Sequence, residues 1–186
     1  MPRAKLPYCD PDLMAPPELR RAVAAADVAT VTRLLDDRPE LVWADRLFLA
    51  VCRVPGYDGH GGEISREDAK EDARVDIARE FLRHGAHPSM RAKRKVTPLH
   101  GCARFDLPKV AELLLEAGGD PNATNVVRET PLYRAVNLGY HAVAEALLRH
   151  GGDPDIRNSK GQTPVDRAAR HKRAELLSLL MAHSRA

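Results

Sequence analysis

A threonine-proline dipeptide recurs at a fixed interval in the second half of the chain. It occurs in VTPLHGCA, ETPLYRAV and QTPVDRAA, where the threonines are Thr97, Thr130 and Thr163. The interval is 33 residues both times. A constant period of roughly 20 to 50 residues is typical of repeat architectures, in which each period is one supersecondary unit. The interval therefore predicts a linear array of similar units rather than a domain closed around one core.

The start of each unit carries the chemistry of a helix N-terminus. Thr97 is a suitable N-cap, and Pro98 follows in the first helical position, where its missing N–H costs nothing. The histidine of TPLH occurs only as His100, because Tyr133 and Asp166 occupy the matching positions. We therefore expect a hydrogen bond between threonine and histidine in one repeat alone.

A second helix follows in each unit. The segment VAELLLEAGGDPN recurs as VAEALLRHGGDPD, and a related segment, IAREFLRHGAHPS, precedes both by the same interval. Val110, Leu113, Leu114 and Ala117 are spaced as one face of a helix, so they predict a single buried stripe. Gly118 follows where a left-handed C-cap is wanted.

The ninth residue after each threonine should end the first helix in a left-handed conformation, which glycine adopts most readily. Glycine stands there only as Gly139, whereas Asp106 and Lys172 hold the matching positions. A residue other than glycine in this conformation costs about 1 kcal/mol. We therefore expect local strain in two of these three repeats.

One such unit cannot bury its apolar stripe alone, so neighbouring units must stack. The motifs TPLHGCA and VAELLLEAGGDPN, with their 33-residue period, resemble ankyrin repeats. This resemblance implies an all-α solenoid of stacked helix-turn-helix units with short hairpin loops. Followed back along the chain, the pattern predicts a flexible lead-in at 1–16, an insertion at 53–72, and five repeats at about 17–44, 45–89, 90–122, 123–155 and 156–186.

The composition indicates a soluble, cytoplasmic protein. Of its 186 residues, 44% are hydrophobic and 30% are charged, and no apolar run approaches the length of a membrane span. The three cysteines are far apart and form no CxxC pair, which argues against a disulfide framework and against a zinc site. We expect a monomer that needs no cofactor.

The insertion is the one segment that could carry chemistry. Asp58, His60 and Glu63 lie close together in a glycine-rich stretch and could converge on a divalent ion, although such a stretch is more often a flexible polar loop. The second half of the insertion predicts an over-long second helix, which is either a wall beside the array or a neutral addition. No Ser, His and Asp set can be assembled from the spacing, so we expect no catalytic residue. The alternative is an enzyme or a metal-dependent protein that uses residues 55–72 and the adjacent surface.

The resemblance implies a protein partner, bound on the concave face by the hairpin loops and the ends of the first helices. By position, the exposed variable residues lie four, three and one residues before each threonine, and seven and eight after it. The candidate partner-binding residues are Lys93, Arg94, Val96, Arg104, Phe105, Val126, Val127, Glu129, Asn137, Leu138, Lys160, Gln162, Arg170 and His171, with Arg53 and Tyr57 in the second repeat.

Four of these candidates are apolar at positions that the solenoid should not bury: Phe105, Val126, Val127 and Leu138. A contiguous exposed apolar patch usually marks a binding site. The other possibility is that some of these side chains fold back beneath neighbouring hairpins.

A cationic stripe accompanies the apolar candidates, formed by Arg91, Lys93, Arg94, Lys95, Arg128, Arg157 and Lys160. It predicts an acidic partner surface, and the alternative is a solvated loop face. Nucleic acid is disfavoured, because aromatic residues for base stacking are missing beside the cations. The sequence thus favours a non-catalytic adaptor, inhibitor or immunity-type binder that recognises an acidic protein.

Overall fold

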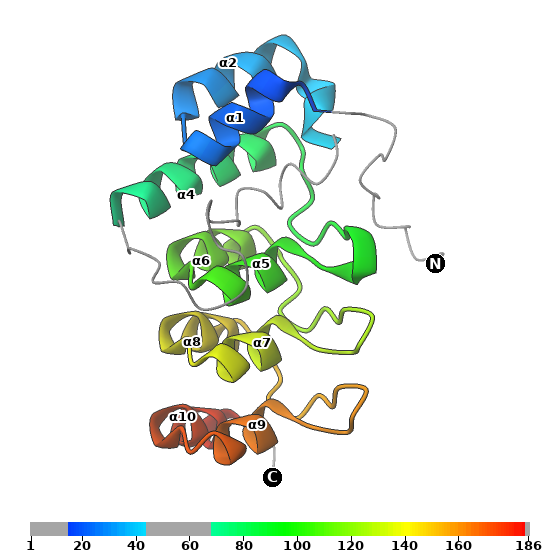
Figure 1. The fold of residues 1–186 in the computed structure, drawn as a ribbon, viewed down its shortest axis with the longest axis vertical. Helices are drawn as coiled ribbons and strands as arrows, with labels where there is room; N and C mark the ends of the chain where they lie inside the picture. The colour runs from blue at the N-terminus through cyan, green and yellow to red at the C-terminus, as the bar shows by residue number, and fades with distance from the viewer. Residues whose placement is uncertain (1–14, 44–67, 185–186) are drawn as a thin grey trace.

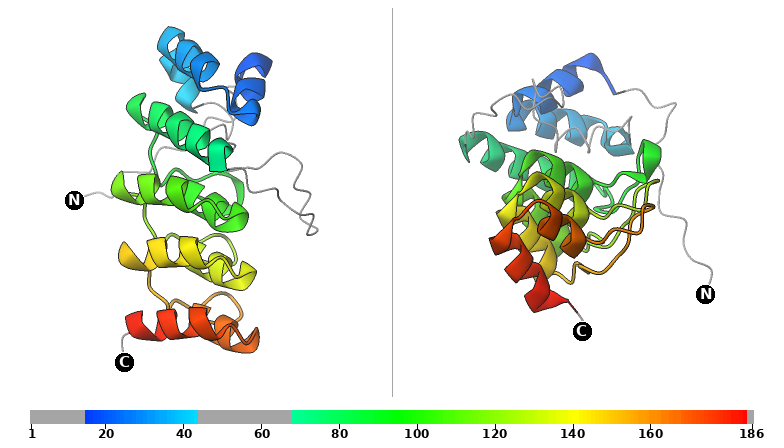
Figure 2. Two further views of the ribbon diagram at one scale, coloured as in Figure 1. Left: turned by 90° about the vertical axis from the view of Figure 1, so that its left-hand side faces the viewer. Right: turned by 60° about the horizontal axis from the view of Figure 1, so that its bottom comes forward.

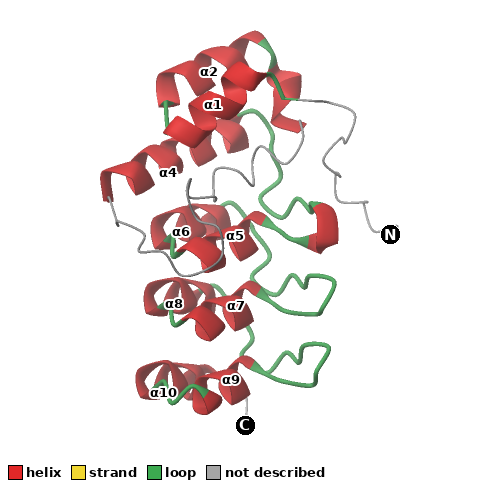
Figure 3. Ribbon diagram, viewed as in Figure 1, coloured by secondary structure: helices red, strands yellow, loops and turns green. Residues whose placement is uncertain are grey.

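The computed structural model describes residues 15–43 and 68–184. Every regular element within these ranges is a helix, and they contain no β-strand (Figure 3). None of these helices combines the length and the apolar character that crossing a membrane requires. The α-helices are α1 Pro17–Ala25, α2 Val28–Asp37, α4 Asp68–Arg83, α5 Pro98–Phe105, α6 Pro108–Glu116, α7 Pro131–Leu138, α8 His141–Arg149, α9 Pro164–Arg170 and α10 Ala174–His183. Two short 3-10 helices are η1 Pro39–Trp43 and η2 Lys93–Lys95.

The helices stack in pairs along one axis, and hairpin loops project from one side of the stack (Figure 1). The first helices α5, α7 and α9 contact one another in order along the chain. The second helices α2, α4, α6, α8 and α10 form a parallel row on the other side of the stack (Figure 2). The prediction of an all-α solenoid of stacked helix pairs is confirmed. The count of five repeats stays a prediction, because the first helix of the second repeat lies outside the described residues.

Each of the three threonines is the N-cap of its helix, as predicted: Thr97 for α5, Thr130 for α7 and Thr163 for α9. The ring of His100 accepts a hydrogen bond from the backbone N–H of Thr97 at 3.3 Å. The Asp166 carboxylate accepts the equivalent bond from the Thr163 N–H at 2.9 Å. The threonine-histidine pair is therefore confined to one of these repeats, as expected, but a carboxylate reproduces its capping role in another.

The left-handed positions also lie where the sequence placed them. Gly118 and Gly139 have φ values of 87° and 88°. Asp106 and Lys172 adopt φ values of 53° and 54° despite their side chains, so the expected strain is present in these two repeats. In the first repeat Ala26 ends α1 in the same conformation, with φ of 59°.

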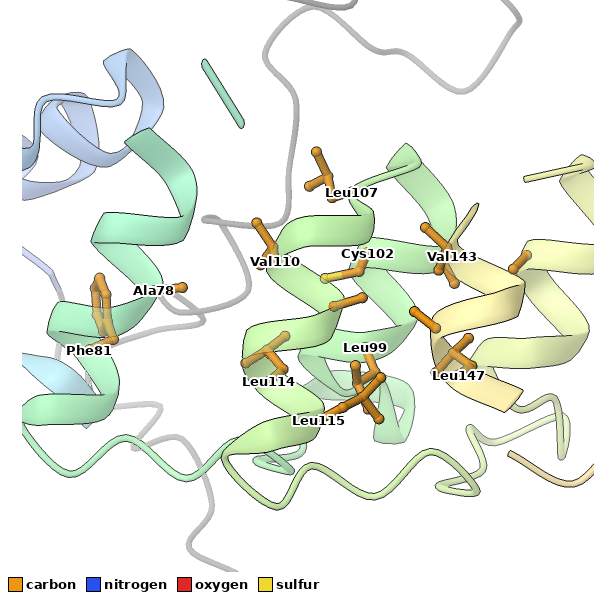
Figure 4. Close-up of a cluster of buried hydrophobic side chains, with 14 of the residues drawn as sticks. Ala78, Phe81, Leu99, Cys102, Leu107, Val110, Leu114, Leu115, Val143 and Leu147 are labelled. Carbon is orange, nitrogen blue, oxygen red and sulfur yellow. The ribbon is translucent and has the colours of Figure 1, made fainter. Parts of the chain in front are cut away.

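A continuous apolar core runs through the described part of the stack. Leu99 and Cys102 of α5 lie between the second helices, where Leu114 of α6 and Leu147 of α8 are also fully buried (Figure 4). Because each repeat shares its apolar surface with its neighbours, the stability of one repeat depends on the repeats beside it.

The predicted stripe on α6 is wrong in part. Val110 and Leu114 are buried, but Leu113 is only half-buried and Ala117 is exposed. The other fully buried residues are Ala111 and Leu115. The reason is that α6 packs against α5 as well as between α4 and α8, so its buried face is wider and centred differently from a single narrow stripe.

The over-long second helix is confirmed, since α4 has 16 residues and α6 has nine. Its first turns contact the N-terminus of α6, whose own N-cap residue, Leu107, provides no side-chain cap. The Glu71 carboxylate accepts a hydrogen bond from the backbone N–H of Lys109 at 2.9 Å, and Asp72 pairs with the Lys109 ammonium at 2.8 Å. The extension therefore caps the helix of the next repeat.

Candidate binding surface

Two of the hairpins are organised by a buried asparagine. The Asn125 side-chain oxygen accepts hydrogen bonds from the backbone N–H groups of Val127 at 2.9 Å and Glu129 at 3.0 Å. Asn158 makes the same two bonds one repeat later. Ala92 holds this position in the third repeat, whose hairpin contains η2. The sequence reasoning missed both asparagines, although their shared place, five residues before the threonine, was a usable signal.

Neighbouring hairpins are joined by backbone hydrogen bonds. The N–H of Val126 donates to the carbonyl of Arg94 at 3.0 Å, and the N–H of Ser159 donates to the carbonyl of Val127 at 2.9 Å. These bonds fix each hairpin relative to the next. The side chains at the tips therefore extend from one continuous scaffold rather than from independent loops.

The hairpin tips hold basic residues in a conformation that favours glycine. The residue two before each threonine has positive φ, which is 57° at Lys95, 59° at Arg128 and 73° at Gly161. Arg94, beside Lys95, also has positive φ, at 64°. The side chains of these three basic residues are exposed. Only the last tip carries glycine, so the other two tips accept strain of about 1 kcal/mol per residue.

Two arginines of the first helices were missed by the sequence reasoning. Arg134 and Arg167 lie four residues after Thr130 and Thr163, whereas candidates were sought seven and eight residues after. Positions four, seven and eight are related as i, i+3 and i+4, and therefore share one face of a helix. The helical period could have identified both arginines.

Arg134 and Arg167 are held in place by neighbouring side chains. Arg134 lies 3.3 Å from a carboxylate oxygen of Glu129, and both side chains are about one quarter exposed. Arg167 donates from Nε to the side-chain oxygen of Asn137 at 2.5 Å, which joins α9 to α7. The candidates Glu129 and Asn137 therefore position arginines.

Gln162 links the next pair of side chains. With its amide nitrogen towards Tyr133, it donates to the Tyr133 hydroxyl at 3.2 Å, and its oxygen accepts from both terminal nitrogens of Arg170, at 3.0 and 3.2 Å. The side chains of Tyr133 on α7, Gln162 in the hairpin and Arg170 on α9 are thus brought together on one surface.

We define the inner face as the surface of the three hairpins and the helices that follow them, residues 91–105, 123–138 and 156–170. These segments contain eleven Lys and Arg residues and only two acidic residues, Glu129 and Asp166. The whole chain has 29 Lys and Arg against 26 Asp and Glu, so the rest of the chain is net acidic. The small net charge of +3 therefore conceals a strong separation of charge.

The electrostatic effect of this separation is visible at His171, at the end of α9. Its pKa is lowered, first by loss of hydration and then by the positive charges of Arg167, Arg173 and Arg170. Nearby cations disfavour a further positive charge, so this end of the inner face has a positive local potential.

The apolar candidates divide into two groups. Val126 and Val127 are 48% and 39% exposed, which is unusual for valine in this structure. Phe105 packs against the core and is partly buried, with the Arg104 guanidinium 5.6 Å from its ring centre. Val96 and Leu138 are half-buried. The two valines are the apolar side chains that the inner face exposes most.

The remaining candidates are placed as follows. Lys160 and Arg170 are exposed, and the backbone of Lys93 begins η2. The candidates of the second repeat lie outside the described residues, as do all three candidate metal ligands: Arg53, Tyr57, Asp58, His60 and Glu63. In the ranges 15–43 and 68–184, no three His, Cys, Asp or Glu side chains are grouped so that they could hold a metal ion.

Taken together, the described residues form a helical repeat protein with a cationic surface along its hairpins and first helices. Residues 99–186 match the family model of ankyrin repeats, in three copies, and this part of the chain therefore consists of ankyrin repeats. No curated protein matches the chain. Ankyrin repeats are generally protein–protein interaction modules.

Proposed function

We propose that this protein is a non-catalytic adaptor or inhibitor whose inner face binds an acidic surface of a protein partner. The observation that carries the proposal is the separation of charge, with eleven Lys and Arg residues against two acidic residues on the inner face. Like charges held together in a folded protein repel one another. An acidic partner offsets this repulsion when it binds.

The strained hairpin tips support the same conclusion. Lys95 and Arg128 adopt positive φ where the last hairpin has Gly161. Backbone strain of this kind persists where the surrounding structure enforces it, and it is concentrated at functional sites. The same backbone turn closes each tip, where the N–H of Arg128 donates to the carbonyl of Asn125 at 3.0 Å and the N–H of Gly161 to the carbonyl of Asn158 at 2.9 Å, and both basic side chains are exposed. The turn also places two cations at the edge of the inner face.

Charged and apolar residues contribute differently to such binding. The exposed cations Arg94, Arg128 and Lys160 accelerate encounter with an acidic surface, and this effect weakens as salt is added. Val126 and Val127 offer apolar area that becomes buried in the complex, which slows dissociation. Binding is therefore expected to be salt-dependent mainly in its association rate.

Affinity capture from the native cell with the full chain tests this proposal. The Arg94→Glu, Lys160→Glu variant reverses two inner-face charges, and Arg79→Glu, Arg149→Glu is the matched control. The control changes the same charge on α4 and α8, where both arginine side chains are more than half exposed. We expect the unaltered chain and the control to capture the same acidic protein, and the inner-face variant to lose it.

Purified components then give the decisive measurement. Association of the captured protein should slow with salt for the unaltered chain, and should be slower with a weaker salt dependence for the inner-face variant. Equal association rates and equal salt dependence for these two chains, with the fold intact by circular dichroism, would contradict the proposal.

A further inference from the structure

Three arginines on α7 and α9 suggest how the inner face holds its partner. We infer that Arg134, Arg167 and Arg170 form a carboxylate-binding subsite, which takes the side-chain carboxylates of an extended segment rich in Asp and Glu. This inference rests on the proposed function, because it names the chemistry by which the inner face recognises a protein.

Neighbouring side chains hold these guanidinium groups in position and leave some of their N–H groups unpaired within the described residues. Arg167 uses Nε to bond Asn137, and its two terminal nitrogens make no hydrogen bond with any residue in the described ranges. Arg134 uses one terminal nitrogen for Glu129, and its buried Nε has no partner there. Arg167, held at its Nε, presents both terminal nitrogens in a fixed geometry that suits bidentate binding of a carboxylate, whereas Arg134 can offer only terminal N–H groups because its Nε is buried.

Arginines of the second helices differ from these three, because they form ion pairs within the chain. Arg149 pairs with Glu112 at 3.0 Å, and Arg79 pairs with Asp76 at 2.6 Å. Arg83 lies 2.7 Å from both Asp36 and Glu80. These charges are neutralised within the chain.

On the inner face, amide oxygens take the place of most of these carboxylates. Asn137 accepts from Arg167, and Gln162 accepts from Arg170. An amide orients a guanidinium without neutralising it, so the positive charge remains for a ligand. Arg134 is the exception, because it shares the Glu129 carboxylate with Asn125.

The spacing of the arginines suits a short acidic segment. Arg134 and Arg167 hold equivalent positions on α7 and α9, which contact each other. Packed helices lie about 8 to 10 Å apart. An extended chain advances about 3.3 Å per residue and points successive side chains to opposite sides, so the nearest two carboxylates on one side come from residues two apart, about 7 Å, and their flexible side chains extend that reach to both arginines. A short acidic segment is long enough to span the subsite.

The acidic residues of the inner face favour a peptide over a nucleic acid as the ligand. Glu129 and Asp166 lie among the arginines, and a phosphodiester backbone would bring a negative charge near them at every nucleotide. A peptide can place neutral residues there. Base stacking is also poorly served, because Tyr133 is only 5% exposed and Phe105 packs against the core.

Fluorescence anisotropy with a labelled oligoglutamate peptide tests the subsite directly. We expect the full chain to bind the peptide, and the Arg134→Gln, Arg167→Gln variant to bind it at least about tenfold more weakly, because two charged contacts are lost. The control variant Arg79→Gln, Arg149→Gln removes the same charge from α4 and α8 and should bind as the unaltered chain does. An oligouridylate of equal charge should compete poorly.

Circular dichroism establishes that each variant folds. If the double variant does not fold, Arg170→Gln replaces it, because Arg170 is exposed and bonds only an amide; about threefold weaker binding is then expected. Unchanged binding by the folded variant, no binding by the unaltered chain, or tighter binding of oligouridylate overturns the inference.

A failure here is distinguishable from a failure of the proposed function. If Arg134→Gln, Arg167→Gln still captures the native partner while Arg94→Glu, Lys160→Glu does not, the subsite is wrong and the acidic-partner proposal stands. If neither variant affects capture, the inner face is not the binding face.

Discussion

The buried imidazole of His100 makes the stability of this array depend on pH. His100 is 2% exposed, and its Nε2 lies 3.0 Å from the carbonyl oxygen of Glu129. A carbonyl can only accept, so Nε2 carries the proton and Nδ1 is unprotonated. Nδ1 accepts from the Thr97 backbone N–H at 3.3 Å and from the Thr97 hydroxyl at 2.8 Å. A second proton on the ring would break this arrangement.

Burial, aided by the charge of Arg134, lowers the pKa of His100 from 6.5 to about 4. In the unfolded chain the ring takes up a proton as pH falls through 6.5, whereas the folded chain takes it up only near 4. Stability is therefore fully present above pH 6.5 and is lost as pH falls to about 4. Since one pKa unit corresponds to about 1.4 kcal/mol, the loss is about 3 kcal/mol.

Urea denaturation followed by circular dichroism at a series of pH values measures this loss. His100→Gln is the control, because glutamine does not titrate; its free energy of unfolding should fall less over the same interval, by the part that other groups such as His171 contribute. The denaturant slope must stay constant with pH for the comparison to hold. A parallel decline in both chains, or a His100 ring that titrates near pH 6.5 by NMR, would contradict the reasoning.

Four further substitutions test individual structural features. Arg128→Gly should raise the free energy of unfolding by up to about 1 kcal/mol, because φ is 59° there; an unchanged or lower urea midpoint contradicts this. Glu71→Ala should lower it by about 1 kcal/mol through loss of the α6 cap, whereas Asp72→Ala, which breaks an exposed ion pair, should cost less than about 0.5 kcal/mol; equal losses in urea contradict this. Gly139→Ala should lower the Tm by calorimetry, because φ is 88° and the new Cβ would lie 3.0 Å from the Arg173 guanidinium carbon; an unchanged Tm contradicts this.

The regular features of the fold were predictable because they depend on local chemistry. A threonine followed by proline fixes where a first helix starts, and Thr97, Thr130 and Thr163 are all N-caps. The left-handed conformations of Asp106 and Lys172 followed from their register alone. In each case the residue and its immediate neighbours contain the physical cause.

Features that depend on contact between repeats were not predictable in the same way. The buried face of α6 is wider than its period suggests, because three helices pack against it. The cap that Glu71 provides for α6 joins residues 38 positions apart, and no pattern in the sequence marks that pair. Arg173, which donates to the carbonyl of Val136 at the end of α7, likewise had no signal beyond its charge.

The candidate surface was predictable from the sequence only in part. Its hairpin residues were identified by register, but Lys95 and Arg128, which lie two residues before the threonines at the tips, were named only as members of the cationic stripe. Arg134 and Arg167 were omitted because only positions seven and eight after the threonine were considered, although the helical period places position four on the same face. What no sequence pattern shows is that Asn137 and Gln162 hydrogen-bond arginines of α9.

NMR of the full chain, labelled with nitrogen-15 and titrated with oligoglutamate, tests most directly whether the inner face is the binding face. We expect the largest shifts at the side-chain Nε–H signals of Arg134, Arg167 and Arg170 and at the backbone amides of the hairpins at 92–96 and 125–129. The amides of α6 and α8 should change little, because these helices lie on the opposite side of the stack from the hairpins (Figure 1). Shifts centred on α6 and α8, with the inner-face arginines unaffected, would contradict the central claim.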